Sequence, residues 1–209
     1  MEPSSAYPVT FSVDYPDRKL NRLTTFFRIF TVIPIAIVAS LVVGSTYGGG
    51  GDTAYYAGAG IGLLTLPVLL MILFRQKYPR WWYDWNLELL RFGNRIAVYL
   101  LLMDDRYPST DEQQSVHLAL PYPDVQADLG RGMPLVKWLL AIPHYFVLFF
   151  IWIGVYFGVI FAWFAILFTG RYPRGLFDFV EGAIRWHNRV IGYAFALVTD
   201  QYPPFRLRP

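Results

Sequence analysis

The feature that most constrains this chain is an uncharged apolar run from Trp138 to Gly170, WLLAIPHYFVLFFIWIGVYFGVIFAWFAILFTG. It contains no Asp, Glu, Lys or Arg, so all of it can enter the hydrocarbon core of a membrane. A single helix of this length would extend about 50 Å, whereas the core is about 30 Å thick. We therefore predict two helices that turn near Gly154. They would form a hairpin over about residues 135–170 that spans the membrane or enters it partway and returns.

A second apolar region precedes this run and is interrupted by glycine. Residues 27–44, which carry no charge after Arg28, and residues 61–74 form two apolar runs, and the stretch STYGGGGDTAYYAGAG at 45–60 separates them. Glycine adopts both signs of φ and disfavours helix, so this stretch predicts a turn. We predict a first membrane hairpin over about residues 27–74, in which Pro34 and Pro67 kink the helices without ending them.

The distribution of charge predicts the topology. Charged residues make up only 16% of the chain, against about 25% in soluble domains. All 18 Lys and Arg residues lie before, between or after the two apolar regions, and the loop at 45–60 carries only Asp52. Because Lys and Arg accumulate on the cytoplasmic side, we predict a multi-pass protein of the cytoplasmic membrane with both termini in the cytoplasm.

The chain contains an internal repeat. RIFTVIP at 28–34 matches KWLLAIP at 137–143, and LLRFGNRIAVYLLLMDDRYP at 89–108 matches AIRWHNRVIGYAFALVTDQYP at 183–203. We predict two tandem copies, at residues 7–108 and 116–207, that form one compact membrane unit. Each copy begins and ends on the same side of the membrane, so the copies should be related by a pseudo-twofold axis along the membrane normal, as in some transporters. An ancient duplication that packs as an internal dimer and transports nothing is the alternative.

A helix rich in aromatic residues is expected after each Tyr-Pro-Arg, over about residues 80–103 and 174–198. Charged side chains recur along one face of each helix at helical spacing, with Trp, Phe and Leu covering the rest. This pattern is typical of a helix that lies in the membrane interface. Four arginines are candidate ligands for lipid headgroups, since the planar guanidinium binds phosphate well: Arg91, Arg95, Arg185 and Arg189. The alternative is pairing within each helix, with Glu88 and Glu181 as the partners.

Short strands should accompany these helices. Residues 8–13 and 115–120 alternate apolar and polar side chains, as half-buried strands do. RYPST at 106–110 and QYPPFRL at 201–207 have proline at positions that suit strand ends or edges. We predict a small cytoplasmic sheet that ties the N-terminal and C-terminal segments together, which makes the fold mainly α with short β-strands.

The chain resembles a known family over nearly its whole length, most specifically in the second copy. The stretch FTGRYPRGLFDFVEGAIRWHNRVIGYAFALVTDQYPPF, echoed in the first half, is similar to the DUF4389 family of bacterial membrane proteins. The first copy departs from this pattern, because Trp81 and Trp82 stand where the second copy has Gly175 and Leu176. The resemblance implies the fold and a bacterial membrane. It implies no activity and no catalytic residue.

The residues offer little chemistry. The chain has no Cys, and it lacks a phosphate-binding loop, a nucleophile elbow and a zinc-binding helix motif. We therefore predict no catalytic residue, no cofactor and no metal. The acidic residues at 104–105 and 111–112 are expected to form a solvated loop beside Arg106, with metal binding as the alternative. His144 is the intramembrane polar candidate, and we expect a neutral ring bonded to a carbonyl that Pro143 frees.

Two classes of function remain once an enzyme is set aside. We predict a scaffold or accessory subunit of a membrane complex. The alternative is a lipid- or ion-transport protein that uses the interface between the two repeats, although few polar residues lie in the apolar runs. The expected partners are membrane lipids, including anionic ones, together with a membrane protein or a second copy of this chain. The net charge of +3 gives no reason to expect nucleic acid.

Overall fold

The computed structural model describes residues 7–43, 64–110 and 112–209. The glycine-rich stretch where the first hairpin is predicted to turn lies outside the described residues, as does Asp111. The described chain is mainly helical, as predicted. In chain order its elements are β1 (Thr10–Val13), α1 (Arg22–Phe26), α2 (Arg28–Val43), a helix over residues 64–75 that ends in the π-helical segment η1 (Met71–Arg75), α4 (Arg80–Leu100), β2 (Val116–Ala119), α5 (Val125–Asp128), α6 (Met133–Leu140), α7 (Ile142–Thr169) and α8 (Arg174–Ala194).

Helices α4 and α8 start where the Tyr-Pro-Arg motifs predict. Pro79 and Pro173 cap them with nearly the same backbone angles, φ −61° and ψ 127° against φ −61° and ψ 126°, and each helix has 21 residues. Both end earlier than predicted. Leu102 and Leu197 have positive φ, 65° and 55°, a left-handed conformation that a continuing helix excludes. The chain therefore leaves each helix at an equivalent place.

The predicted turn near Gly154 is wrong. Helix α7 runs through this residue without a break for 28 residues, about 42 Å at 1.5 Å per residue. A Cβ added to Gly154 would lie 3.3 Å from Cζ of Phe179, and one added to Gly158 would lie 3.5 Å from Cδ2 of Leu176. The glycines thus let α8 approach closely, and the packing offsets the roughly 1 kcal/mol that glycine costs a helix.

The two strands form an antiparallel ribbon. Phe11 pairs with Leu118, and on either side of this pair Thr10 faces Ala119 and Ser12 faces His117. The two predicted strands are confirmed in shortened form. The predicted link between the N- and C-terminal segments is wrong, because β1 pairs with the strand at mid-chain and the described residues at 106–110 and 201–207 form no strand.

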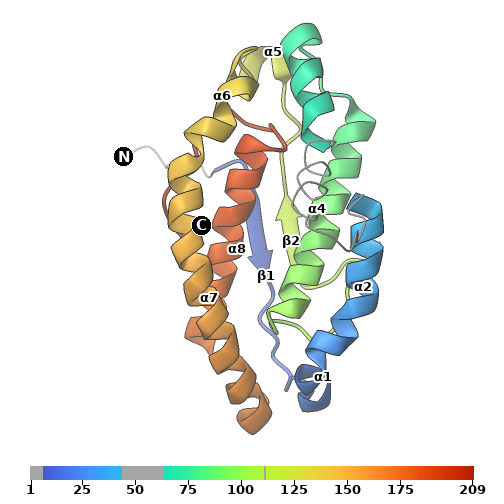
Figure 1. Cartoon of the computed structure of the whole chain (residues 1–209), viewed down its shortest axis with the longest axis vertical. Helices are drawn as coiled ribbons and strands as arrows, with labels where there is room; N and C mark the ends of the chain where they lie inside the picture. The colour runs from blue at the N-terminus through green and yellow to red at the C-terminus, as the bar shows by residue number, and fades with distance from the viewer. Residues whose placement is uncertain (1–6, 44–63, 111) are drawn as a thin grey trace, which may run out of the picture.

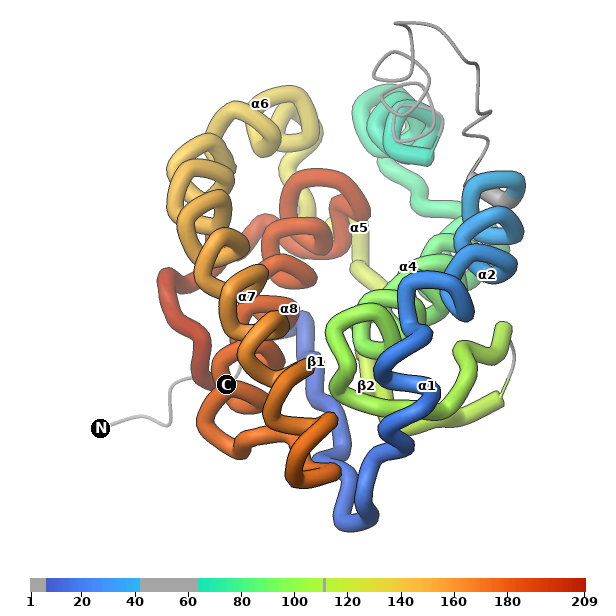
Figure 2. Tube along the Cα trace, turned by 60° about the horizontal axis from the view of Figure 1, so that its bottom comes forward, coloured from blue at the N-terminus to red at the C-terminus, as the bar shows by residue number. Residues whose placement is uncertain are grey.

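The helices lie in pairs around the ribbon. Figure 1 shows α7 beside α8 and α2 beside α4, with β1 and β2 between the two pairs. Its colours show that α7 and α2 run in opposite directions, as do α8 and α4. Figure 2 shows α7 and α2 as the outer helices. The halves of the chain therefore face each other head to tail along the long axis of the molecule.

The outer helices expose apolar side chains along their length. Among the described residues, one helical run, Met133–Thr169, is long and apolar enough to cross a membrane, by length and composition. One face of α7 packs on α8, with Leu148, Val155 and Ile166 buried. The opposite face exposes Phe146, Phe149, Phe150, Ile153, Phe157, Ile160, Phe161, Phe164 and Phe168. Helix α2 likewise exposes Ile29, Phe30, Ile33, Ile37 and Leu41.

Candidate functional site

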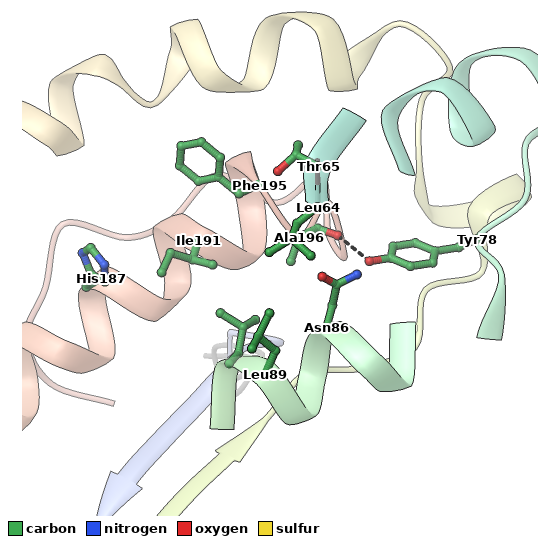
Figure 3. Close-up of a pocket in the computed structure, with 10 residues that line it drawn as sticks. Leu64, Thr65, Tyr78, Asn86, Leu89, His187, Ile191, Phe195 and Ala196 are labelled. Carbon is green, nitrogen blue, oxygen red and sulfur yellow. Dashed lines mark hydrogen bonds between the residues drawn. The ribbon is translucent and has the colours of Figure 1, made fainter. Parts of the chain in front are cut away.

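A cavity of about 270 Å³ lies between α4 and α8 (Figure 3). Helix α4 lines one wall with Asn86, Leu89 and Leu90, and α8 lines the facing wall with His187 and Ile191. The cavity thus lies between equivalent helices of the two halves.

The other walls come from three further segments. Leu64 and Thr65, at the start of the helix that ends in η1, border the cavity on one side, and Tyr78 borders it on another. Phe195 and Ala196 line it where the chain leaves α8. The ten lining residues include no Asp, Glu, Lys or Arg, and His187 is the one lining residue that titrates near neutral pH. The cavity is therefore mainly apolar.

The polar groups at the cavity are occupied or neutral. Tyr78 donates its hydroxyl to the carbonyl oxygen of Ala196 at 3.0 Å, and burial raises the pKa of this tyrosine. Asn86 donates its amide to the carbonyl of Trp82 at 2.9 Å. Desolvation lowers the pKa of His187, whose ring meets Trp152 of α7 edge-on at 5.7 Å between centroids. A neutral ring therefore faces the cavity at physiological pH.

Two of the four arginines predicted to bind lipid headgroups instead donate hydrogen bonds to the backbone of the ribbon. Arg91 of α4 donates its Nε–H to the carbonyl of Leu118 at 3.1 Å, and Arg185 of α8 donates its Nε–H to the carbonyl of Phe11 at 2.8 Å. Each also forms an ion pair within its helix, Arg91 with Glu88 at 2.6 Å and Arg185 with Glu181. The predicted pairing is confirmed. The contacts to the strands were missed, although they satisfy carbonyls at the open edges of the ribbon.

The other two arginines hold the segments that follow the helices. Arg95 donates to the carbonyls of Ser109 and Thr110 at 3.0 and 3.1 Å. Arg189 donates to the carbonyls of Arg206 and Arg208 at 3.2 and 3.1 Å. The segments that follow α4 and α8 were predicted as strands, but they are irregular. Their carbonyl oxygens accept hydrogen bonds from these two guanidinium groups.

Burial limits what the four arginines can bind. Arg95, Arg185 and Arg189 are 7%, 7% and 3% exposed, whereas the side chain of Arg91 is 35% exposed. Three of the four are therefore enclosed by protein and directed at backbone carbonyls. A lipid headgroup at this set stays a prediction, and Arg91 is the member with an open surface.

His144 is buried in α7, but its partner differs from the one predicted. Its Nδ1 accepts a hydrogen bond from Nε1 of Trp186 at 3.0 Å, so it does not bind a carbonyl that Pro143 frees. An accepting Nδ1 places the ring proton on Nε2 in the neutral tautomer. The ring also stacks on Phe205, 4.0 Å between centroids. His144 therefore fastens α7 to α8 and to the C-terminal segment.

Two buried cations at equivalent places were missed. Lys137 is fully buried and lies 2.8 Å from the carbonyl of Thr199 and 2.7 Å from Oδ1 of Asp200. Arg28 is 2% exposed and donates to the carbonyl of Asp104 at 3.0 Å. Each residue opens one copy of the repeated motif RIFTVIP/KWLLAIP, which is the signal that could have found them.

The acidic residues at 104–105 do not form a solvated loop beside Arg106. Asp104 is buried and accepts from the hydroxyl of Ser115 at 2.6 Å and from Arg18 at 3.1 Å. Burial acts to raise the pKa of Asp105, but its hydrogen bonds to Arg18 and to the N–H of Asn21 lower it overall. Among the described residues, no group of three or more His, Cys, Asp or Glu could hold a metal ion.

A reciprocal amide pair joins α4 to α8. Asn94 donates to Oδ1 of Asn188 at 2.9 Å, and Asn188 donates to Oδ1 of Asn94 at 2.7 Å. Both residues are buried. The shared Arg-aromatic-X-Asn-Arg motif contains both, and within it His187 stands where the first copy has Gly93.

Comparison with known proteins adds one match. The family described as Domain of unknown function (DUF4389) matches residues 133–206, which comprise α6, α7, α8 and the segment after them. This supports the resemblance drawn from the sequence for the second half of the chain. No curated protein and no solved structure matches.

Proposed function

We propose that this protein is a non-enzymatic scaffold or accessory subunit embedded in a bacterial cytoplasmic membrane, built from two tandem copies of one unit at about residues 7–108 and 116–207. The observation that carries the proposal is the division of the molecule into outer apolar helices and an inner ribbon whose exposed face is largely polar. The buried charges that join them are engaged with backbone carbonyls or with each other, which is the pattern of a structural framework.

Matched contacts support the duplication. Arg91 binds β2 as Arg185 binds β1. Tyr122 donates to the carbonyl of Tyr78 at 2.5 Å, and Tyr15 donates to the carbonyl of Tyr172 at 2.6 Å. Contacts of these kinds recur because one local design is used twice.

The same correspondence supports a position for the pseudo-twofold axis that we propose between the two copies. A residue paired with its own counterpart lies on such an axis, and this holds for Asn94 with Asn188 and for Phe11 with Leu118. The axis thus passes through the ribbon and between α4 and α8, across the long direction of the helices. We propose that it coincides with the membrane normal, as the sequence predicts.

This axis implies that α7 lies along the membrane. The halves run head to tail along the long axis of the molecule (Figure 1). If that axis crossed the bilayer, the halves would have inverted topology and their cations would fall on opposite sides. Outer helices that lie in the plane of one leaflet, with the ribbon toward the cytoplasm, keep Lys and Arg on one side without the hairpin turn that the continuous α7 rules out.

The ribbon gives a second argument for this orientation. Trp186 bonds His144, and Phe179 packs on Gly154, so residues 179–186 of α8 lie level with residues 144–154 of α7. The ribbon contacts this same part of α8 through Arg185. A crossing α7 would carry the exposed polar ribbon into the hydrocarbon core, where open sheet edges are not tolerated.

Cysteine labelling separates the two orientations, and the native chain has no Cys to interfere. Single cysteines at Gly132 and Thr169 mark the two ends of the α6–α7 run, and both positions are exposed. An impermeant maleimide should label both from the cytoplasmic side only, and Ser12→Cys on the ribbon should behave alike. Labelling of the two ends from opposite sides would show that α7 crosses the membrane and would contradict the in-plane orientation.

Partner capture tests the scaffold role. The ribbon exposes Thr10, Ser12 and His117, and we expect a partner protein to bind there. Thr10→Glu with Ser12→Glu should remove that partner from the complex isolated in mild detergent, while Ile153→Glu on α7 should release the chain from the membrane without affecting the ribbon. A complex unchanged by both ribbon substitutions would contradict this surface.

One observation favours the alternative, a lipid-transport role. The cavity between α4 and α8 lies at the interface between the two copies, where transport would occur. Ion transport gains no such support, because Asp, Glu, Lys and Arg are absent from the lining of this cavity.

A further inference from the structure

We propose that the cavity between α4 and α8 binds one acyl chain of a membrane lipid. The inference rests on the proposed membrane embedding and goes beyond the scaffold role, because it assigns a ligand class to a site. It follows from the position of the cavity, its lining and its access.

The lining suits a hydrocarbon chain. Leu89, Leu90, Ile191 and Phe195 supply most of the surface, and the cavity volume is about 270 Å³. Apolar cavities stay dry and take up apolar guests in place of water. An acyl chain that enters from the bilayer and fills this space gains van der Waals contacts that an empty cavity lacks.

The few polar groups favour the same guest. Tyr78 and Asn86 already donate to backbone carbonyls, and the ring of His187 lies against Trp152. A charged or strongly polar ligand would lose its hydration here without gaining a charged partner. An acyl chain has no polar group that needs a hydrogen-bond partner, so it can bind here although Tyr78 and Asn86 already donate to the backbone.

The cavity adjoins the surface that we place in lipid. Leu64 and Thr65, which border it, begin a helix that exposes Leu66 and Leu70 at 54% and 42%. On the other side, the ring of Phe195 lies tilted against that of Tyr145 of α7, 6.4 Å between centroids. A lipid beside these helices therefore meets exposed apolar side chains next to the residues that border the cavity.

Photo-crosslinking tests the assignment directly. The purified full chain is reconstituted into phosphatidylcholine vesicles that contain some phosphatidylcholine with a diazirine on one acyl chain, and adducts are mapped by mass spectrometry after illumination. We expect adducts on the outer face of α7, around Phe157, and separately on Leu89, Ile191 and Phe195 in the cavity. Adducts at Phe157 without adducts in the cavity would overturn the acyl-chain site and leave membrane embedding intact. An absence of adducts at Phe157 would overturn membrane embedding and the site with it.

Filling the cavity supplies the matched variants. Leu89→Trp and Ile191→Trp should remove most of the cavity adducts, because the indole ring occupies volume that the acyl chain would fill. Ile153→Trp makes a similar change on the outer face of α7 and should leave the cavity adducts unchanged. Equal cavity adducts in all three variants would contradict the proposal.

A second measurement does not depend on the folding of any variant. Native mass spectrometry of the wild-type chain, released from the same vesicles, should show one retained phosphatidylcholine per chain after weakly bound lipid has been removed. If tryptophan disrupts the fold, Ile191→Phe provides a smaller change, and its retained lipid should fall relative to wild type. A wild-type chain that retains none would overturn the site.

Discussion

Helices α4 and α8 have the same length and the same proline start, but they are buried to different extents. Thirteen residues of α8 are buried, against six of α4. Helix α8 lies between the 28-residue α7 on one side and β1 and the C-terminal segment on the other, whereas α4 is covered by the 16-residue α2. Two helices of equal length and similar start thus differ in burial, and α8 is a core helix whereas α4 is half-exposed.

The difference shows that the neighbours decide how strongly equivalent contacts stabilise the molecule. Exposed pairs are equal in the two halves: Arg80 lies 3.3 Å from Asp84 and Arg174 lies 3.5 Å from Asp178, with both arginines 66% exposed. The inner arginines differ, because Arg185 is buried where Arg91 is half-exposed. We therefore expect substitutions in the second half to cost more than their counterparts in the first.

The largest expected effect concerns the two buried cations. Lys137→Ala leaves Asp200 and the carbonyl of Thr199 without their cation, and breaking a buried ion pair costs about 3 kcal/mol. Arg28→Ala should cost less, because Arg28 binds a carbonyl and the ring face of Tyr99 rather than a carboxylate. The free energy of unfolding in mixed micelles measures both. Equal losses would show that the halves are energetically equivalent after all.

A smaller loss of stability is expected when a side chain is added at Gly182, which packs closely against the C-terminal segment. A Cβ on Gly182 would lie 2.8 Å from Cβ and 3.0 Å from the carbonyl oxygen of Leu207, so Gly182→Ala should displace this segment and cost about 2 kcal/mol. Gly93 of α4 has open space around it, and Gly93→Ala is the control, which should gain up to about 1 kcal/mol of helix stability. Protease cleavage near Leu207 reports the displacement. Resistance equal to wild type would contradict it.

The amide pair tests the contact between the halves themselves. Asn188→Leu leaves the buried amide of Asn94 with one partner fewer, at a cost of about 1–2 kcal/mol. Asn94→Leu should cost a similar amount, and the double variant should cost less than the sum of the two. A double-mutant cycle of unfolding free energies measures the coupling. Additive losses would mean that the two amides do not interact.

The smallest effect is a dependence on pH confined to the first half. Interactions with Arg18 and Asn21 hold the pKa of Asp105 below its ordinary value of 3.8. The folded state therefore releases this proton more readily than the unfolded state, and the resulting stability is present above pH 3.8 and lost as pH falls through the lowered pKa. Asp105→Asn should flatten stability in this acidic range. Because Arg18 is about half-exposed, the change should be small and should shrink with added salt.

The sequence by itself determined the local elements. The Tyr-Pro-Arg motifs predicted the starts of α4 and α8, because proline fixes its own φ and suits the residue before a helix. Alternating side chains predicted both strands, and helical spacing predicted the ion pairs of Arg91 and Arg185. Each of these signals depends on residues that are close together in the chain, so it can be recognised from the sequence alone.

Tertiary structure alone decided the contacts between distant segments. Glycine favours turns, and a turn was predicted near Gly154. The residue instead lies within α7, where Phe179 packs closely against it. Arg95 and Arg189 reach carbonyls 14 to 19 residues away, and nothing in their spacing predicts which backbone groups will come within reach. The cavity between α4 and α8 exists because two helices about ninety residues apart in the chain meet at an amide pair and leave space beside it. Packing fixes such positions, since close-packed side chains must fit three-dimensional neighbours that the linear pattern does not identify.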